Sequence, residues 1–272
     1  MKLRIFQDSR IGRRHGNQDR TGFAYAAHRA LLVVADGMGG HPRGELAAEI
    51  AVEHVLRRFA DWAREDGRDA EGMLRGALDE AHRGIRERAR EDRLPDWPRT
   101  TCTVCVIVDA TATWCHVGDS RLYFVRDGEV LATTRDHSGA WLLVEQGLID
   151  PEEARVHPDR NFVYNCLGGD SAPEVEVSPA TALVRGDRIL LCSDGLWSPL
   201  TNAEIVAAVA RDPSPTGLEP LLREAEERAG VYADNLSYVV VAVGDEADED
   251  GIEIDTLAPG EAVVCCGPTP PL

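Results

Sequence analysis

Five aspartates of this sequence recur in one context, at the edge of an apolar strand and beside a small or turn-forming residue. They are Asp19 in NQD before GFAYAA, Asp36 at the end of LLVVAD, Asp119 after HVG, Asp194 at the end of ILLCSD, and Asp234 before LSYVVVAV. The end of a strand holds a side chain in a fixed position, and carboxylates are suitable ligands for hard cations such as Mg²⁺ and Mn²⁺. Any one of these aspartates alone is more often a turn residue or a helix cap.

Convergence of these side chains would require cations. Two carboxylates about 4 Å apart repel by roughly 4 kcal/mol at an effective dielectric constant of about 20. A cluster of four must therefore either take up protons or bind metal, and an open polar site at neutral pH favours metal. The sequence alone leaves open whether the five residues meet.

The elements that must position these aspartates come in blocks of strands and blocks of helices. Apolar periodicity predicts strands at 3–7, 22–27, 30–35, 101–109, 111–118, 121–127, 129–134, 188–193 and 236–243. It predicts helices at 44–64, 70–91, 202–211 and 218–229, and a mixed loop and short-helix region at 138–170. Blocks of this kind favour antiparallel sheets covered by helix pairs over a doubly wound parallel sheet.

The 272 residues divide into a globular body and an acidic tail. Residues 1–244 form the predicted domain, whereas 245–272 hold eight acidic residues, no basic residue and several prolines. We expect this tail to be largely flexible. Its IEIDTL segment alternates apolar and polar residues, so it could add a short strand.

Composition excludes several classes of function. The net charge of −18 disfavours binding to nucleic acid through phosphate contacts, and no apolar run is long enough to span a membrane. The charged N-terminus lacks an apolar signal core, which predicts a cytoplasmic location with free thiols. Lys2 is the one lysine, so neither a Walker A loop nor a kinase nucleotide lysine is available. Cys102 and Cys105 should face opposite sides of a strand as structural thiols.

Six stretches together resemble the metal-dependent Ser/Thr protein phosphatases of the PPM (PP2C) family, in the compact bacterial form. They occur in family order and span about 14–241. They are RHGNQD (14–19), VVADGMGGH (33–41), HVGDSRLY (116–123), RDHS (135–138), GDRILLCSDGLW (186–197) and DNLSYVVV (234–241).

This resemblance implies a four-layer α-β-β-α sandwich of the α+β class, with two central antiparallel sheets flanked by helix pairs. It also implies a centre of two Mn²⁺ or Mg²⁺ ions. Asp36 would bridge the two ions, and the Gly37 carbonyl would bind one of them. Asp194 and Asp234 would complete the shell of the other ion.

Three further residues receive roles from the same resemblance. Asp19 would hold a metal-bound water or a metal directly, and Asp119, with help from Asp194, would form a third, weaker metal site. Arg14 would grip the substrate phosphate. A metal-activated water would then hydrolyse phosphoserine or phosphothreonine in proteins, without a phospho-enzyme.

The sequence departs from the family pattern at several positions. Met38 stands where eukaryotic relatives place a histidine proposed as the general acid. His41 is a candidate for that role, and a metal-bound water is the alternative. Arg10, together with Arg13 and Arg14, makes a basic rim that either favours acidic substrates or is simply solvated. The segment 161–168 (NFVYNCLG) departs from the usual run, which predicts altered peptide specificity.

We therefore expect a protein-serine/threonine phosphatase whose partners are phosphorylated proteins and a Hanks-type kinase. One alternative is a non-catalytic phosphoprotein-binding scaffold on the same fold. A second is a phosphatase dedicated to one regulator, such as an anti-sigma antagonist.

Overall fold

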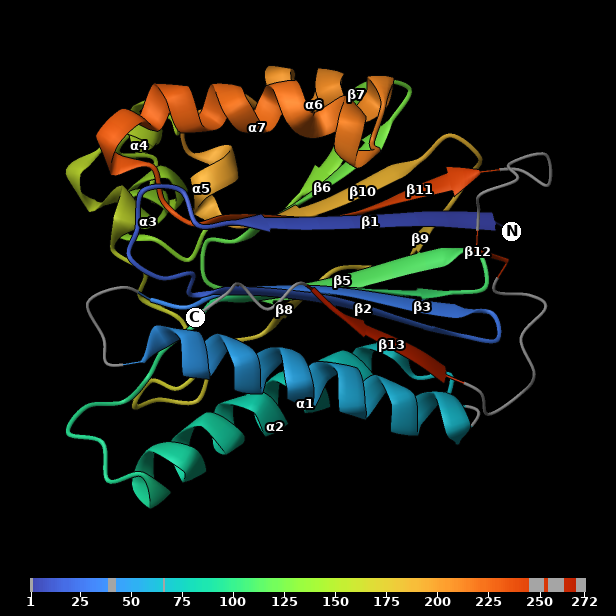
Figure 1. Cartoon of the computed structure of the whole chain (residues 1–272), viewed down its shortest axis with the longest axis horizontal. Helices are drawn as coiled ribbons and strands as arrows, with labels where there is room; N and C mark the ends of the chain where they lie inside the picture. The colour runs from blue at the N-terminus through green and yellow to red at the C-terminus, as the bar shows by residue number, and fades with distance from the viewer. Residues whose placement is uncertain (1, 39–42, 66, 245–251, 254–261, 268–272) are drawn as a thin grey trace.

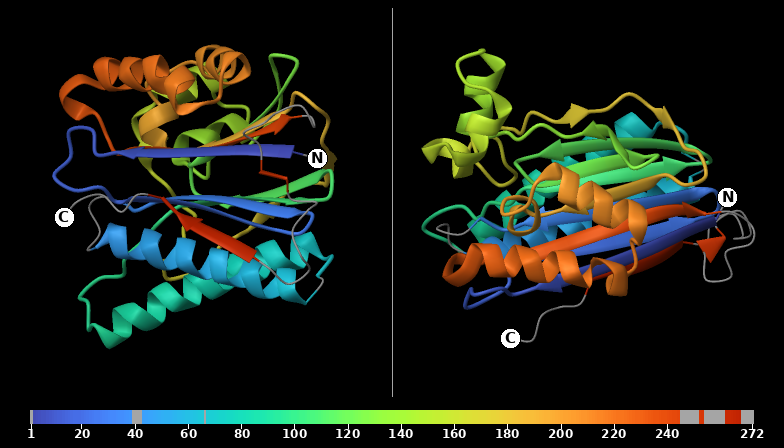
Figure 2. Two further views of the ribbon diagram at one scale, coloured as in Figure 1. Left: turned by 45° about the vertical axis from the view of Figure 1, so that its right-hand side comes forward. Right: turned by 90° about the horizontal axis from the view of Figure 1, so that it is seen from above.

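Two antiparallel β-sheets pack face to face, and helices cover both outer faces (Figure 1). The computed structural model describes residues 2–38, 43–65, 67–244, 252–253 and 262–267. The left view of Figure 2 shows the two sheets nearly edge-on between the helical layers. The predicted four-layer α-β-β-α sandwich of the α+β class is therefore confirmed.

The first sheet has six strands, and its neighbouring strands are antiparallel. In spatial order they are β12 (Ile252–Glu253), β1 (Lys2–Arg10), β11 (Leu236–Gly244), β10 (Arg188–Cys192), β6 (Arg121–Arg126) and β7 (Glu129–Thr133). The second sheet runs β13 (Ala262–Cys266), β2 (Asp19–Ala26), β3 (Arg29–Asp36), β4 (Cys102–Val108), β5 (Thr111–Val117) and β8 (Glu176–Val177), and β9 (Thr181–Ala182) also pairs with β5.

Two long helices cover the second sheet, and a shorter set covers the first sheet (Figure 1). The long pair is α1 (Gly44–Arg64) and α2 (Ala70–Glu91). The set on the first sheet is α5 (Asp194–Trp197), α6 (Asn202–Arg211), α7 (Pro215–Ala229) and η2 (Gly230–Tyr232). A separate flap lies at the left of Figure 1 and contains α3 (Gly139–Glu145), α4 (Pro151–Val156) and η1 (Pro158–Asn161).

The core explains why β3 is an unbroken apolar run. Leu32 and Val34 pack between the two sheets, whereas Leu31 and Val33 pack under α1 and α2. When both faces of a strand are buried, the side chains on both faces are apolar, so the sequence shows no alternation of apolar and polar residues. Its first polar residue after this run is Asp36, at the end of the strand.

The thiols of β4 follow the same alternation. Cys102 belongs to the core under the helices and Cys105 to the core between the sheets. Both are free and buried. The prediction of two structural thiols on opposite faces of one strand is confirmed.

Parts of the C-terminal tail extend both sheets. β12 pairs with β1, and β13 pairs with β2 over five residues. The Gly267 amide then donates to the Thr21 carbonyl at 2.8 Å. The predicted strand in IEIDTL is present at Ile252–Glu253. The prediction of a largely flexible tail concerns residues 245–251, 254–261 and 268–272, which lie outside the described residues.

No helix within the described ranges combines the length and the apolar character needed to cross a bilayer.

Candidate active site

The β2–β3 hairpin brings the first two aspartates together. Asp19 begins β2, Asp36 ends β3, and the two residues are direct cross-strand partners. The Asp36 amide donates to Thr101 Oγ1 at 3.0 Å, and the Asp36 carbonyl accepts from the Thr101 amide at 2.9 Å. These two bonds fix the backbone of Asp36 against the start of β4.

Glycine is required directly after Asp36. A Cβ atom on Gly37 would lie 2.3 Å from the Gly44 carbonyl oxygen and 2.7 Å from the Gln18 carbonyl oxygen. No side chain fits between these backbones, so glycine permits the close approach. Gly37 lines the same pocket as Asp36.

The other three aspartates come from distant parts of the chain and reach the same pocket. Asp119 follows β5, Asp194 begins α5 directly after β10, and Asp234 precedes β11. Together with Asp36 they line one open pocket of about 410 Å³. Asp19 is buried beside it, with 1% of its surface exposed, and repels Asp36 and Asp194. All five aspartates thus converge.

The pocket raises the pKa of four of these carboxyl groups. Removal from water is the largest cause, and repulsion from neighbouring carboxylates follows. The pKa of Asp194 rises to about 7 and that of Asp19 to about 6, while the pKa values of Asp36 and Asp119 rise well above the usual range. Near neutral pH the cluster has a strong affinity for positive charge, either protons or cations.

The donor set fits hard divalent cations. Asp19 Oδ2 accepts a hydrogen bond from Ser193 Oγ at 2.7 Å, whereas Asp19 Oδ1 is buried and accepts none from the described residues. A buried, unpartnered carboxylate oxygen is costly unless a cation or a proton compensates it. Carboxylate and carbonyl oxygens are the ligands that Mg²⁺ and Mn²⁺ prefer.

Arg14 supplies positive charge at the rim of the pocket. Its Nη2 lies 2.5 Å from Asp234 Oδ2, and its side chain is 54% exposed. The hydrogen bond with Asp234 raises the pKa of Arg14, so the guanidinium stays charged. Because a guanidinium has five N–H donors, it can hold Asp234 and an anionic ligand together.

His41, the candidate general acid, lies outside the described residues. Met38 does line the pocket.

His116 and His137 stack with their ring centroids 4.5 Å apart, and Glu176 lies beside them. Their ligand-type atoms come within 4.8 Å of one another. His137 Nδ1, however, accepts from the Gly118 amide at 3.1 Å and from Asn165 Nδ2 at 2.9 Å. The neutral ring therefore presents an N–H at Nε2 rather than a lone pair. Nε2 of His116 lies 2.7 Å from the Arg135 carbonyl oxygen. These contacts give both histidines a structural role.

Sequence reasoning missed Asn235. Its Oδ1 accepts from the Gln18 amide at 2.8 Å, and its Nδ2 donates to the carbonyls of Ile11 and Gly16 at 2.9 and 3.0 Å. One side chain thereby holds both ends of the loop that carries Arg14. The available signal was its place in DNLSYVVV, directly after Asp234.

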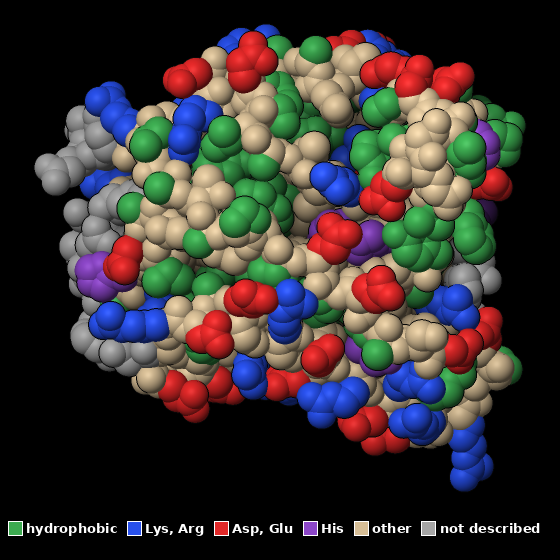
Figure 3. All heavy atoms as spheres, turned by 180° about the vertical axis from the view of Figure 1, so that it is seen from behind, with side chains coloured by type: hydrophobic (Ala, Val, Ile, Leu, Met, Phe, Trp, Pro, Cys, Tyr) green, Lys and Arg blue, Asp and Glu red, His purple; other side chains and the backbone are tan. Residues whose placement is uncertain are grey.

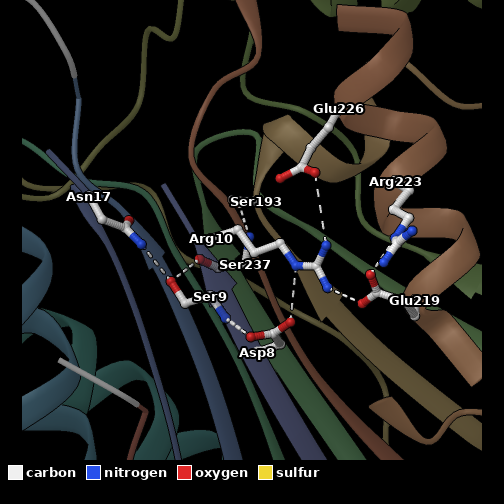
Figure 4. Close-up of polar contacts among 9 residues, drawn as sticks. All are labelled: Asp8, Ser9, Arg10, Asn17, Ser193, Glu219, Arg223, Glu226 and Ser237. Carbon is white, nitrogen blue, oxygen red and sulfur yellow. Dashed lines mark hydrogen bonds and ion pairs between the residues drawn. The ribbon is translucent and has the colours of Figure 1, made fainter. Parts of the chain in front are cut away.

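The structure removes Arg10 from the predicted basic rim (Figure 4). Its guanidinium makes ion pairs with Asp8 at 3.2 Å, with Glu226 at 3.9 Å and with Glu219. Its side chain is 23% exposed. Arg10 ties the end of β1 to α7, so it is a structural residue and not a docking residue.

Comparisons with known proteins give one family. The model of the family "Protein phosphatase 2C" matches residues 6–231. The serine/threonine protein phosphatase PstP of Mycobacterium tuberculosis is 31% identical over 92% of this chain, which spans about half of the PstP length (49%). The protein phosphatase PhpP of Streptococcus pneumoniae is 30% identical over 87% of this chain and 96% of its own.

A solved structure is also similar. It is the catalytic domain of the serine/threonine protein phosphatase PstP in complex with two manganese ions. It is 31% identical, covers 90% of this chain and 99% of its own, and has a TM-score of 0.69. The family match includes Asp19, Asp36, Asp119 and Asp194, whereas Asp234 and the strand β11 that follows it lie beyond its end. This chain belongs to the protein phosphatase 2C family.

Proposed function

We propose that this protein hydrolyses phosphoserine and phosphothreonine in proteins, with bound divalent metal. The observation that carries the proposal is the convergence of five aspartates and one arginine on a single open pocket. The family membership and the manganese-bound relative support it.

The proposed metal site uses the oxygen ligands of the pocket. Asp36 and the Gly37 carbonyl would hold one Mn²⁺ or Mg²⁺ ion, and Asp36, Asp194 and Asp234 would hold a second. Asp19 would bind a metal or its water. When bound, divalent ions lower the pKa of a coordinated water and so supply the nucleophile near neutral pH. Asp119 would hold a third, weaker ion.

The chain's own residues orient the substrate. Arg14 would bind two phosphoryl oxygens through its planar fork and neutralise charge that develops on them. Thr101 holds the Asp36 backbone through two hydrogen bonds, so the carboxylate need not rearrange when substrate arrives. The proton donor to the leaving oxygen is proposed as His41, with a coordinated water as the alternative.

The substrates and partners follow from the same proposal. Phosphorylated cytoplasmic proteins and a Hanks-type kinase are the proposed partners. The alternatives are a phosphatase dedicated to one regulator and a scaffold that binds phosphoproteins without hydrolysis. No observation on the described residues favours the scaffold, because Arg14 and the proposed metal ligands other than Asp19 line the pocket, and Asp19 is buried beside it.

Hydrolysis of a phosphothreonine peptide, with Mn²⁺ and with chelator, tests the proposal. We expect turnover with Mn²⁺, less with Mg²⁺ and none in chelator. Asp36→Asn should lose several orders of magnitude in rate. Full activity after exhaustive chelation would contradict the proposal, and a Mn²⁺-loaded protein that binds phosphopeptide without releasing phosphate would favour the scaffold.

A further inference from the structure

A chain of small polar side chains lies behind Asp19, away from the pocket. It consists of Asn17, Ser9, Ser237 and Ser193, four residues from four separate parts of the sequence (Figure 4). Ser193 and Ser237 are fully buried. Ser9 and Ser237 are direct cross-strand partners on β1 and β11.

The donor–acceptor distances between these polar residues are all 3.0 Å or less. Ser193 Oγ donates to Asp19 Oδ2 at 2.7 Å and accepts from the Ser237 amide at 3.0 Å. Ser9 Oγ and Ser237 Oγ are 2.7 Å apart. Asn17 Nδ2 donates to Ser9 Oγ at 2.8 Å, and Asn17 Oδ1 accepts from the Asp19 amide at 3.0 Å.

One assignment of the hydroxyl protons satisfies all of these contacts. Because Asn17 Nδ2 can only donate, Ser9 Oγ accepts there and its own proton is free to point at Ser237 Oγ. The Ser237 hydroxyl proton is then available to Asp19. The hydroxyls of Ser193 and Ser237 both lower the pKa of Asp19, opposing the rise caused by burial.

We propose that Ser193, Ser237, Ser9 and Asn17 are positioning residues that orient the Asp19 carboxylate for metal. They hold its Oδ2 from behind and its backbone from the side, which leaves Oδ1 as the oxygen available to a cation. This inference rests on the proposed function, since it assumes that the aspartate cluster binds metal. Outer partners of metal ligands commonly fix the ligand's orientation in this way.

A purely structural role is the competing explanation, because Ser9 and Ser237 also join β1 to β11. The two roles differ in what they predict. A structural role affects unfolding and leaves metal affinity unchanged. A positioning role affects metal affinity even where the fold is intact.

Mn²⁺ affinity of the full chain, measured by titration calorimetry or by the electron paramagnetic resonance signal of free Mn²⁺, separates them. Loss of an outer partner typically weakens metal affinity about 10- to 100-fold. We expect the dissociation constant to rise about 10-fold in Ser9→Ala and Ser237→Ala, whereas Ser9→Thr, which keeps the hydroxyl on a strand, should stay near the unchanged chain. Ser178→Ala is the matched control, since it removes a hydroxyl that accepts from the Trp114 amide at 3.0 Å outside the pocket.

The outcomes are distinguishable. Ser9 is half-buried, so its variants remain informative if Ser237→Ala fails to fold. If the unchanged chain binds no Mn²⁺, or if Asp36→Asn binds it equally well, the proposed function fails. If the unchanged chain binds Mn²⁺ and both alanine variants bind it with the same affinity, the positioning role is overturned.

Discussion

At the residue scale, two arginines that are close in sequence have different roles, one at the pocket and one in the fold. Arg14 lines the pocket and is 54% exposed, whereas Arg10 is surrounded by three carboxylates between β1 and α7. We expect Arg14→Ala to lower kcat/KM for a phosphopeptide by about 100-fold, the usual effect of losing one transition-state donor. Its free energy of unfolding should fall by at most about 1 kcal/mol, because the Arg14 side chain is more than half exposed and its ion pair with Asp234 is screened by solvent.

Arg10→Ala should show the reverse pattern. Stability should fall by on the order of 1 kcal/mol, a modest loss because the carboxylate partners are about one-third exposed and screened by solvent. Peptide kinetics with Mn²⁺ and urea unfolding of both variants check this contrast. A kinetic defect in Arg10→Ala at unchanged stability would restore the basic-rim interpretation.

The carboxylate cluster makes the stability of the metal-free protein depend on pH. The folded pKa values of Asp194 (about 7) and Asp19 (about 6) lie above that of an unfolded aspartate, about 3.9. The folded state therefore binds these protons more tightly. Its stabilisation from them is complete below about pH 4 and is lost as the pH rises towards 7.

Asp194→Asn removes one of the repelling charges. In chelator it should raise the melting temperature at pH 8 more than at pH 5, as measured by thermal unfolding. Added Mn²⁺ should protect the unchanged chain more than the variant. A variant that is less stable than the unchanged chain at pH 8 would show that the Asp194 carboxylate gains more from its contacts than it loses by repulsion.

Residue types and spacing predicted the five aspartates, but not their partners. Aspartates at strand ends stand out in a sequence because apolar runs precede or follow them. Serines such as Ser193 and Ser237 do not stand out, since their role depends on which strands become neighbours. Arg10 was misinterpreted for the same reason: its acidic partners on α7 lie more than 200 positions away in the sequence.

At the element scale, most predicted segments match the structure. The largest shift among the predicted helices is in α7, which begins at Pro215 rather than at 218. Ser214 caps it by accepting from the Gly217 amide at 3.2 Å, and Pro215 occupies the first turn. The predicted segment already includes Pro220, so the difference is confined to the first turn of the helix.

The flap gives a prediction about peptide choice. Phe162 is 64% exposed and lines the pocket, yet it supports no described core. Phe162→Ala should change kcat/KM for phosphopeptides with different flanking residues, while turnover of p-nitrophenyl phosphate stays close to that of the unchanged chain. Val156→Ala, 78% exposed on the flap but not lining the pocket, is the control. Equal effects of the two variants would place peptide recognition elsewhere.

At the scale of the whole molecule, the face in Figure 3 carries no single continuous acidic area among its described residues. Acidic and basic side chains are interspersed there around hydrophobic areas. The tail contributes eight of the acidic residues, and its strand β13 covers the edge of β2.

Truncation after Gly244 tests what this strand does. We expect turnover of a small phosphate ester to persist, because no described tail residue lines the pocket. The melting temperature should fall and self-association should rise, because an open strand edge pairs readily with another chain. Unfolding and light scattering measure both, and an unchanged melting temperature would mean that β13 contributes nothing to the fold.

The direct opposition of Asp19 and Asp36 has a consequence for how loops in this protein can change. Side chains along a strand alternate between faces, so slippage of β2 against β3 by a single position would send one of the two carboxylates to the wrong side. The turn that sets this alignment lies at Ala27–His28, at the far end of the hairpin from the pocket. A one-residue insertion at this turn is remote from every reacting group. If the pairing of β2 with β3 shifts by one residue to accommodate it, we expect catalysis to be abolished. If the extra residue forms a bulge and the pairing is kept, catalysis should be preserved.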